Sequence, residues 1–341
     1  MTQIDGSEDK QQEARLWAFR KVFVKDPTLQ EILRGIKTLH QSGCGTTHAQ
    51  CMGLFGPSGS GKTRLVRYYE RTFMKSLRKT TYCEGDIEIE IKPLLFVECP
   101  ARATVKGVAE TLLTVLGDPR PSRGSQQEMT QRILHLLRVR RTSLIVMDEF
   151  QHLVARSSNA VAAYETADWI KSLLNENICP IVLVGTDPAA EILKVNEQLQ
   201  RRNFASFRIM AYSVSTEAEM KVFQNMLSGL EKALGLPLPS CLADEDLARR
   251  LHIASDGLIG RVTGLLDRAL LLAIERQENS ISRQILRDVF SRTEGILPIQ
   301  PNPFSPKALL AGNPVKPEDN SRRLRARGGR DGGSLGGKLS A

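Results

Sequence analysis

The chain has 341 residues and a net charge of +9, with 41% hydrophobic and 25% charged side chains. This composition is close to the average of soluble globular proteins, so a sizeable buried core is feasible. No apolar run reaches the roughly 18 residues that a membrane span needs, and the polar N-terminus is unlike a signal peptide, so we expect a cytoplasmic protein without a membrane partner.

The positive charge is spread unevenly along the chain. Residues 321–341 carry +5, which leaves only +4 for the rest of the protein. A basic balance favours a polyanionic partner such as nucleic acid, although most of this chain is nearly neutral. The six cysteines are scattered without a Cys-x-x-Cys pair, which indicates small buried side chains rather than metal or disulfide chemistry.

Residues 1–14 have the composition of a disordered lead, and a helical pattern runs from about Glu13 to His40. Short apolar runs then alternate with helical stretches, an order typical of strands buried on both faces of a parallel sheet. We therefore predict a parallel five-stranded sheet with helices on both faces, in an α/β domain over residues 15–212. The candidate strands are Cys51–Phe55, Leu94–Val97, Ser143–Met147, Ile181–Val184 and Phe207–Ala211.

The pattern changes after Tyr212. Four amphipathic helical stretches follow without a strand signal between them, which predicts a small all-helical domain over residues 213–297. Residues 298–341 are rich first in Pro and then in Arg and Gly, and we expect a disordered basic tail there. Such a tail is either a nucleic-acid tether, a hook for a partner protein, or a solvated extension of no consequence.

The strongest motif lies between the first predicted strand and the next helix, and it fits G-x-x-x-x-G-K-[ST]. Its glycines let backbone N–H groups turn toward phosphate oxygens, the lysine reaches the β- and γ-phosphates, and the threonine hydroxyl binds Mg²⁺. The alternative is a glycine-rich turn, but the flanking strand and helix favour an ATP site. The motif consists of Gly56, Pro57, Ser58, Gly59, Ser60, Gly61, Lys62 and Thr63.

Two acidic residues end the apolar run Leu144–Met147. Asp148 is expected to hold Mg²⁺ together with Thr63, and Glu149 is expected to act as the general base that polarises the attacking water. Taken alone, this pair could equally be an ordinary acidic turn. The presence of the phosphate loop makes the acidic turn the weaker interpretation.

Two later features complete the predicted site. Thr186 follows the strand Ile181–Gly185 and is placed to contact the γ-phosphate or the water, with a simple turn as the alternative. Arg201 and Arg202 end a short helical stretch, where one of them is a candidate arginine finger acting on a neighbouring subunit. A solvated helix end is the alternative for these two arginines.

With these motifs in order, the chain resembles the TniB/TnsC family of AAA+ transposition ATPases. The resemblance covers about residues 15–295 and depends most on the strand ending in Gly-Thr, followed by Gln-Leu-x-x-Arg. It is carried by GPSGSGKT (56–63), LIVMDEFQHL (144–153), the helix around Trp169, IVLVGT (181–186), NEQLQRR (196–202) and the segment Ser255–Arg261.

The resemblance implies an AAA+ P-loop fold with a helical lid, ATP and Mg²⁺ as ligands, and a regulatory ATPase. It implies assembly into a ring or filament on double-stranded DNA, and coupling of a TniQ/TnsD-type target selector to a DDE transposase. Thr186 would be sensor 1, where many AAA+ proteins have Asn. Arg201 or Arg202 would be the finger, and Arg261 would be sensor 2.

Two basic segments are candidates for DNA contact through phosphates, namely Arg102, Thr104 and Lys106 after the second strand, and Arg120 with Arg123 further on. Solvated surface charge is the alternative for both. Two other functions remain open: a replication-initiator or helicase-loader ATPase, which usually adds a winged-helix DNA reader after the lid, and a signalling or scaffold ATPase without nucleic acid.

Overall fold

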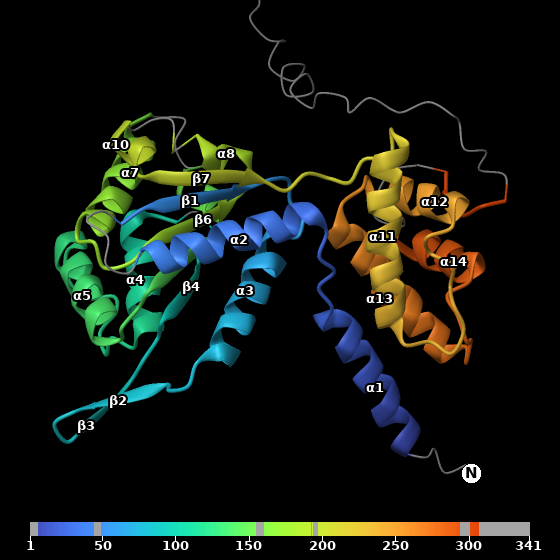
Figure 1. Ribbon diagram of the computed structural model, residues 1–341, viewed down its shortest axis with the longest axis horizontal. Coiled ribbons are helices and arrows are strands. Elements are labelled where there is room, and N and C mark those ends of the chain that lie inside the picture. Colours follow the sequence, from blue (N-terminus) through green and yellow to red (C-terminus); the bar gives the residue numbers. More distant parts are fainter. Residues whose placement is uncertain are drawn as a thin grey trace, which may run out of the picture. The chain divides into compact units, whose positions relative to one another are not determined.

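The α/β part of the protein is built on a five-stranded parallel sheet in the order β4-β5-β6-β1-β7 (Figure 1). The computed structural model describes residues 6–43, 49–101, 103–154, 160–191, 193, 197–293 and 301–306. Four strands lie within one residue of their predicted runs, while β7 begins four residues early. The strands are β1 (Cys51–Phe55), β4 (Leu94–Glu98), β5 (Leu144–Asp148), β6 (Ile181–Gly185) and β7 (Asn203–Arg208).

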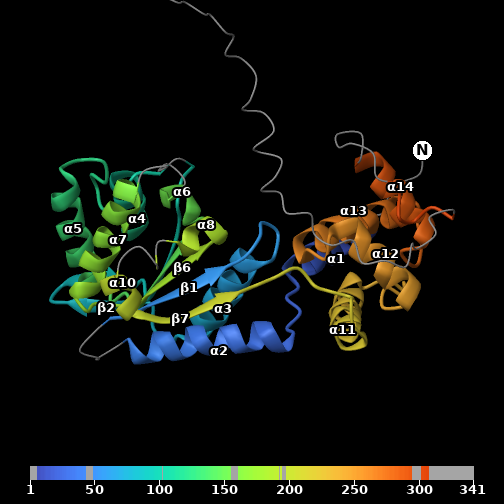
Figure 2. The same cartoon turned by 90° about the horizontal axis from the view of Figure 1, so that it is seen from above.

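Helices cover both faces of this sheet (Figure 2), as predicted. Successive side chains of a strand point to opposite faces, so Met52 and Leu54 pack with one layer while Cys51 and Phe55 pack with the other. The first layer holds α2 (Pro27–Ser42) and α3 (Lys62–Ser76). The second holds α4 (Val105–Leu116), α5 (Gln126–Val139) and α7 (Ala160–Asn175). Three short helices complete this part of the chain: α6 (Gln151–Val154), α8 (Asp187–Ala190) and α10 (Glu197–Arg201).

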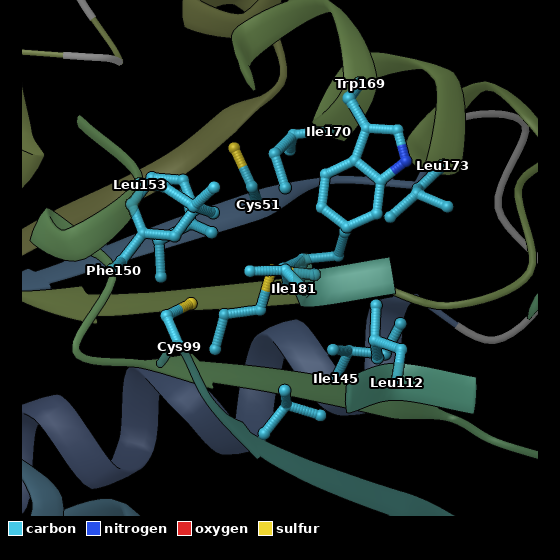
Figure 3. Packing of buried hydrophobic residues seen from close by; sticks show 14 of the residues in the cluster. Cys51, Cys99, Leu112, Ile145, Phe150, Leu153, Trp169, Ile170, Leu173 and Ile181 are labelled. Carbon is cyan, nitrogen blue, oxygen red and sulfur yellow. The ribbon is translucent and has the colours of Figure 1, made fainter. Parts of the chain in front are cut away.

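Trp169 of α7 anchors the second layer. Its ring extends from the helix toward Ile181 and Ile145 on the sheet (Figure 3), and the side chain is only 4% exposed. Its indole N–H donates to the Thr130 hydroxyl over 3.2 Å, so the buried polar atom has a partner. The helix that carried part of the family resemblance therefore has a packing role in the core.

The N-terminal segment differs from the prediction in two ways. A single helical pattern was expected from Glu13 to His40, but the chain forms α1 (Gly6–Lys21) and α2, separated at Asp26. Pro27 has no N–H and starts α2, and the Asp26 carboxylate caps it by accepting from the Leu29 N–H over 2.8 Å. Residues 6–14 are thus helical where a disordered lead was expected, and residues 1–5 lie outside the described part.

The helical part of the protein consists of α11 (Glu217–Leu234), α12 (Glu245–Ser255), α13 (Ile259–Glu275) and α14 (Arg283–Thr293). Helix α1 packs against α11 and α13, and Phe19 belongs to their apolar cluster. The helical core therefore draws on a segment before the sheet, although the α/β domain was expected to begin at residue 15.

The chain after α14 returns to this cluster. Phe304 is 1% exposed and meets Phe290 edge to face, with ring centroids 5.9 Å apart. The carbonyl of Pro303 accepts a hydrogen bond from the buried Arg250 guanidinium. Residues 301–306 are thus packed where a disordered tail was expected from residue 298, and the rest of that predicted tail, from residue 307, lies outside the described residues.

A hairpin between α3 and β4 was absent from the predicted elements. It pairs β2 (Thr81–Glu84) with β3 (Ile87–Glu90) in antiparallel register, and Gly85 turns the chain with a φ of 61°. Its side chains are mostly exposed, so it lacks the continuous apolar run used to predict the other strands. None of the helices in the described ranges is long and apolar enough to cross a membrane.

Candidate nucleotide-binding site

The loop between β1 and α3 has the backbone of a phosphate cradle. Gly59 and Gly61 have φ angles of 79° and 94°, a region that other residues rarely adopt. At Gly56, an added Cβ would lie 2.1 Å from the carbonyl oxygen of Ile209, so only glycine fits. Gly61 offers no side-chain cap to α3, so the first N–H groups of that helix are available to an anion.

Lys62 lies inside this loop. Its ammonium group donates to the carbonyl oxygens of Gly56 over 2.9 Å and Pro57 over 2.8 Å. Burial lowers the pKa of Lys62, and the nearby Glu149 and Asp148 carboxylates oppose that shift. The lysine is therefore a cation held by carbonyl groups at the floor of the loop, within reach of a phosphate chain.

Asp148 and Thr63 meet at the end of β5. Asp148 is 2% exposed, and burial raises its pKa, while hydrogen bonds from the Thr63 hydroxyl and the Glu149 N–H oppose the shift. Mg²⁺ is usually held by one or two oxygen side chains together with substrate phosphates. Thr63 and Asp148 supply two such oxygen side chains side by side, which fits this mode of binding. No group of three His, Cys, Asp or Glu side chains suited to a metal occurs in the described ranges.

Gln151 joins the predicted general base to predicted sensor 1. Its amide nitrogen donates to a Glu149 carboxylate oxygen, and its amide oxygen accepts from the Thr186 N–H over 3.0 Å. Because both ends are engaged, the side chain fixes the distance between the ends of β5 and β6. Sequence reasoning missed this residue, although it stands two positions after Glu149 in the quoted motif.

A cavity of about 540 Å³ opens beside the phosphate loop. It brings together Lys62, Thr63, Glu149 and Thr186 with apolar side chains from three other segments, and of these only the segment around Ile259 was predicted to lie at the nucleotide. The lining includes Phe23 and Val24 between α1 and α2, Ile209–Tyr212 after β7, and Val222, Met226 and Ile259 of the helical part. A cavity with one polar, cationic end and one apolar end suits a nucleoside phosphate.

Tyr212 ties these lining segments together. Its backbone N–H donates to the Gly257 carbonyl over 2.9 Å, and its hydroxyl donates to Asp26 over 2.5 Å. Burial and the bond to Asp26 raise the pKa of the phenol, which keeps it protonated as a donor. The chain leaving the sheet is thus fixed both to the cap of α2 and to the turn before α13.

The start of α13 meets the phosphate loop, but the predicted sensor-2 arginine points elsewhere. Gly260 donates its N–H to the Gly59 carbonyl over 2.8 Å, and Gly260 and Thr263 line the cavity. Arg261 forms an exposed ion pair with Asp256 and is not among the lining residues. The structure therefore brings the predicted helix to the loop without bringing the Arg261 guanidinium to it.

The two candidate finger residues have different surroundings. Arg202 donates to the carbonyls of Ala49 and Leu174 and, over 2.8 Å, to the Asn175 side chain, so it is engaged within its own subunit. Arg201 is exposed at the end of α10. Its guanidinium forms no hydrogen bond or ion pair with the described part of the chain. Neither residue lines the cavity.

The predicted DNA-contacting residues fall at opposite ends of α4. Thr104 caps the start of the helix by accepting from the Gly107 N–H, and Lys106 is exposed in its first turn. Arg120 and Arg123 are exposed in the loop after its C-terminus, where Arg132 holds their carbonyls. Twelve helical residues separate the groups by about 18 Å. Arg102 lies outside the described residues.

The sheet order, the phosphate loop after β1 and the acidic pair at the end of β5 define a nucleotide-binding protein of the AAA+ P-loop class, with a C-terminal helical part. Residues 16–214 match the family described as "Bacterial TniB protein", and the chain belongs to this transposition-associated AAA+ ATPase family. The family and fold suggested by the sequence motifs are therefore confirmed. No curated protein sequence matches the chain.

Several solved structures share the fold at low sequence identity. The chain is similar to Cdc6p from Pyrobaculum aerophilum, with a TM-score of 0.59, 16% identity, and 83% of this chain and 72% of that one covered. It is also similar to Aeropyrum pernix ORC1 in complex with DNA, with a TM-score of 0.57, 18% identity and coverages of 82% and 69%. The Aeropyrum pernix ORC2 protein, solved with ADPNP and ADP, has a TM-score of 0.54, 16% identity and coverages of 82% and 70%.

Proposed function

We propose that this protein binds ATP with Mg²⁺, hydrolyses it, and uses the cycle to assemble on double-stranded DNA. In this role it couples a TniQ/TnsD-type target selector to a DDE transposase. The observation that carries the proposal is the convergence of Lys62, Thr63 and Glu149 on one cavity, with Asp148 bonded to Thr63. Membership of the TniB family supports the role in transposition.

Each residue of the cavity has a distinct task. Lys62 and the N–H groups of the loop hold the β- and γ-phosphates, while Thr63 and Asp148 hold Mg²⁺, which neutralises phosphate charge when bound. Glu149 accepts the proton of the attacking water, and Gln151 keeps its carboxylate oriented. Thr186 follows β6, where its hydroxyl is available to the water or the γ-phosphate.

The position of Arg201 supports completion of the site by a neighbouring subunit. The guanidinium is exposed and remote from its own cavity, whereas Arg202 is engaged by three groups of its own chain. We therefore assign the finger that acts in trans to Arg201. Arg261 is paired with Asp256 and would have to break this ion pair to reach the phosphates. We propose that it does so when it acts as sensor 2.

Contact with DNA is proposed for the first turn of α4. Thr104 and Lys106 follow β4, whose carboxyl end lies at the same edge of the sheet as the phosphate loop. Arg120 and Arg123 lie about 18 Å away at the other end of the helix, so they would contact a different phosphate from that bound by Lys106. Contacts of this kind are sequence-independent and weaken with salt.

Electron microscopy with a non-hydrolysable ATP analogue, with and without duplex DNA, tests this proposal. We expect rings or filaments that require both ligands, and no assemblies from Lys62→Ala. Lys106→Ala should reduce assembly on DNA while nucleotide binding stays intact. Assembly without DNA that is also insensitive to DNA would instead favour a scaffold ATPase, the competing function from the sequence.

A further inference from the structure

An ion pair spans the strand that leads into the phosphate loop. Phe55, the last residue of β1, is paired with Gly185 of β6 on one side and with Arg208 of β7 on the other. Asp187 follows two residues after Gly185, and its carboxylate lies 3.1 Å from the Arg208 guanidinium. The pair therefore crosses the end of β1 at the point where the phosphate loop begins.

Arg208 is part of the cavity lining, and its partner Asp187 directly follows Thr186. Arg208 lines the same space as Lys62, Glu149 and Thr186. Arg64 also lines this space, but its guanidinium donates to the Arg20 carbonyl over 2.6 Å and is engaged by α1. Arg208 is thus a cavity arginine that pairs with a single carboxylate, that of Asp187.

The Arg208–Asp187 ion pair is weak enough for a phosphate to replace Asp187 as the partner of Arg208. The two side chains are 54% and 55% exposed, and ion pairs in such positions contribute little to stability. A guanidinium binds a phosphate through parallel charge-assisted hydrogen bonds, and a terminal phosphate carries about −1.5 to −2 charges near neutral pH. A phosphate that enters the cavity therefore competes well against Asp187.

We propose that Arg208 senses the terminal phosphate of the nucleotide, exchanging Asp187 for the γ-phosphate of ATP and returning to Asp187 with ADP. This inference rests on the proposed ATP-binding function and adds to it a discrimination between ATP and ADP made within one subunit. Asp187 is the first residue of α8, directly after Thr186, so the exchange also releases the segment that follows predicted sensor 1.

Binding constants for a non-hydrolysable ATP analogue and for ADP test the assignment. In Arg208→Ala we expect the analogue to bind about tenfold more weakly, because charge-assisted hydrogen bonds are lost, with ADP changed less than twofold. Arg208→Lys should recover part of the loss. Asp187→Asn should strengthen binding of the analogue by a few-fold, because the competing carboxylate is removed.

The matched control is Arg249→Ala, which removes an exposed arginine paired with Glu245 on α12 and should change neither constant. A loss of affinity equal for both nucleotides in Arg208→Ala, or no loss, overturns the sensing role. If the wild-type protein binds neither nucleotide, the proposed function fails and this assignment fails with it. Thermal unfolding of each variant shows whether the fold is intact, and Asp187→Asn remains informative if Arg208→Ala does not fold.

Discussion

Gly260 donates its backbone N–H to the carbonyl oxygen of Gly59 over 2.8 Å, so the helical part of the protein touches the phosphate loop backbone to backbone. An added Cβ at residue 260 would lie 2.8 Å from that same oxygen. The close approach therefore depends on glycine at this position. Through this hydrogen bond, we expect a change in the loop on nucleotide binding to reach α13.

Gly260→Ala should weaken nucleotide binding by about tenfold, because the methyl group separates α13 from the loop and overpacking of this kind costs about 1–3 kcal/mol. Isothermal titration with ATP analogue measures the change. Gly264→Ala is the control on the same helix, since an added Cβ there meets nothing within 4 Å. Equal affinities in the two variants would show that the contact has no part in binding.

Arg201 and Arg202 should separate into a functional and a structural residue. Arg201→Ala should reduce hydrolysis by about 10³–10⁵-fold without lowering the melting temperature, because a finger acts only on the neighbour's phosphates. Arg202→Ala should destabilise the fold by about 1–3 kcal/mol, because the carbonyls of Ala49 and Leu174 and the Asn175 side chain lose their donor.

A mixing experiment locates the finger. Lys62→Ala subunits bind no nucleotide but can supply Arg201, so mixing them with Arg201→Ala subunits should restore part of the hydrolysis. Full activity of Arg201→Ala on its own would rule out this residue as the finger.

The parts of the site that could be predicted from sequence consist of residues close together in the chain. The parts that were missed consist of residues that only the folded structure brings together. The phosphate loop and Asp148 follow directly from a strand and its next residues, so their positions could be predicted. Phe23 and Met226 reach the cavity from segments far apart in the chain, which no spacing rule reveals. The choice of Arg201 over Arg202 likewise depends on the neighbours Ala49 and Asn175, which only the fold supplies.

His40 on α2 is buried, and both of its ring nitrogens are hydrogen-bonded to partly buried side chains. Its Nε2 atom lies 2.7 Å from the Ser143 hydroxyl oxygen. Because that hydroxyl donates its own proton to the Pro93 carbonyl oxygen, Nε2 must be the donor to Ser143. Nδ1 then accepts from the Tyr69 hydroxyl over 2.8 Å. Burial lowers the pKa of His40 from 6.5 to about 4.

Acidification should therefore destabilise the fold. Between pH 6.5 and 4 the unfolded chain binds a proton at His40 that the folded chain does not, so stability falls as the pH drops through this range. The loss from His40 should be about 2 kcal/mol at pH 5 relative to pH 7.5. Urea unfolding at both values measures it, and His40→Gln should remove this part of the pH dependence. A variant with the wild-type pH dependence would contradict the assignment.

Phe304 should stabilise the helical part although it lies beyond the last helix. Phe304→Ala should cost about 3–5 kcal/mol in the free energy of unfolding, because the ring is 1% exposed and packs on Phe290. Phe204→Ala is the matched control, since that ring on β7 is 37% exposed and its loss should cost about 1 kcal/mol or less. Similar costs in both variants would mean that residues 301–306 do not pack in solution.

ATP hydrolysis by the Glu149→Gln variant, measured beside nucleotide binding, tests the proposed catalytic site most directly. Glu149 lines the cavity with Lys62 and Thr63, and Gln151 holds its carboxylate. We predict that Glu149→Gln binds ATP as the wild type does and releases phosphate about 10²–10⁴-fold more slowly, as expected for loss of a general base. Lys62→Ala should bind no ATP. Wild-type turnover in Glu149→Gln, or ATP binding in Lys62→Ala, would contradict the assignment of this cavity as the ATPase site.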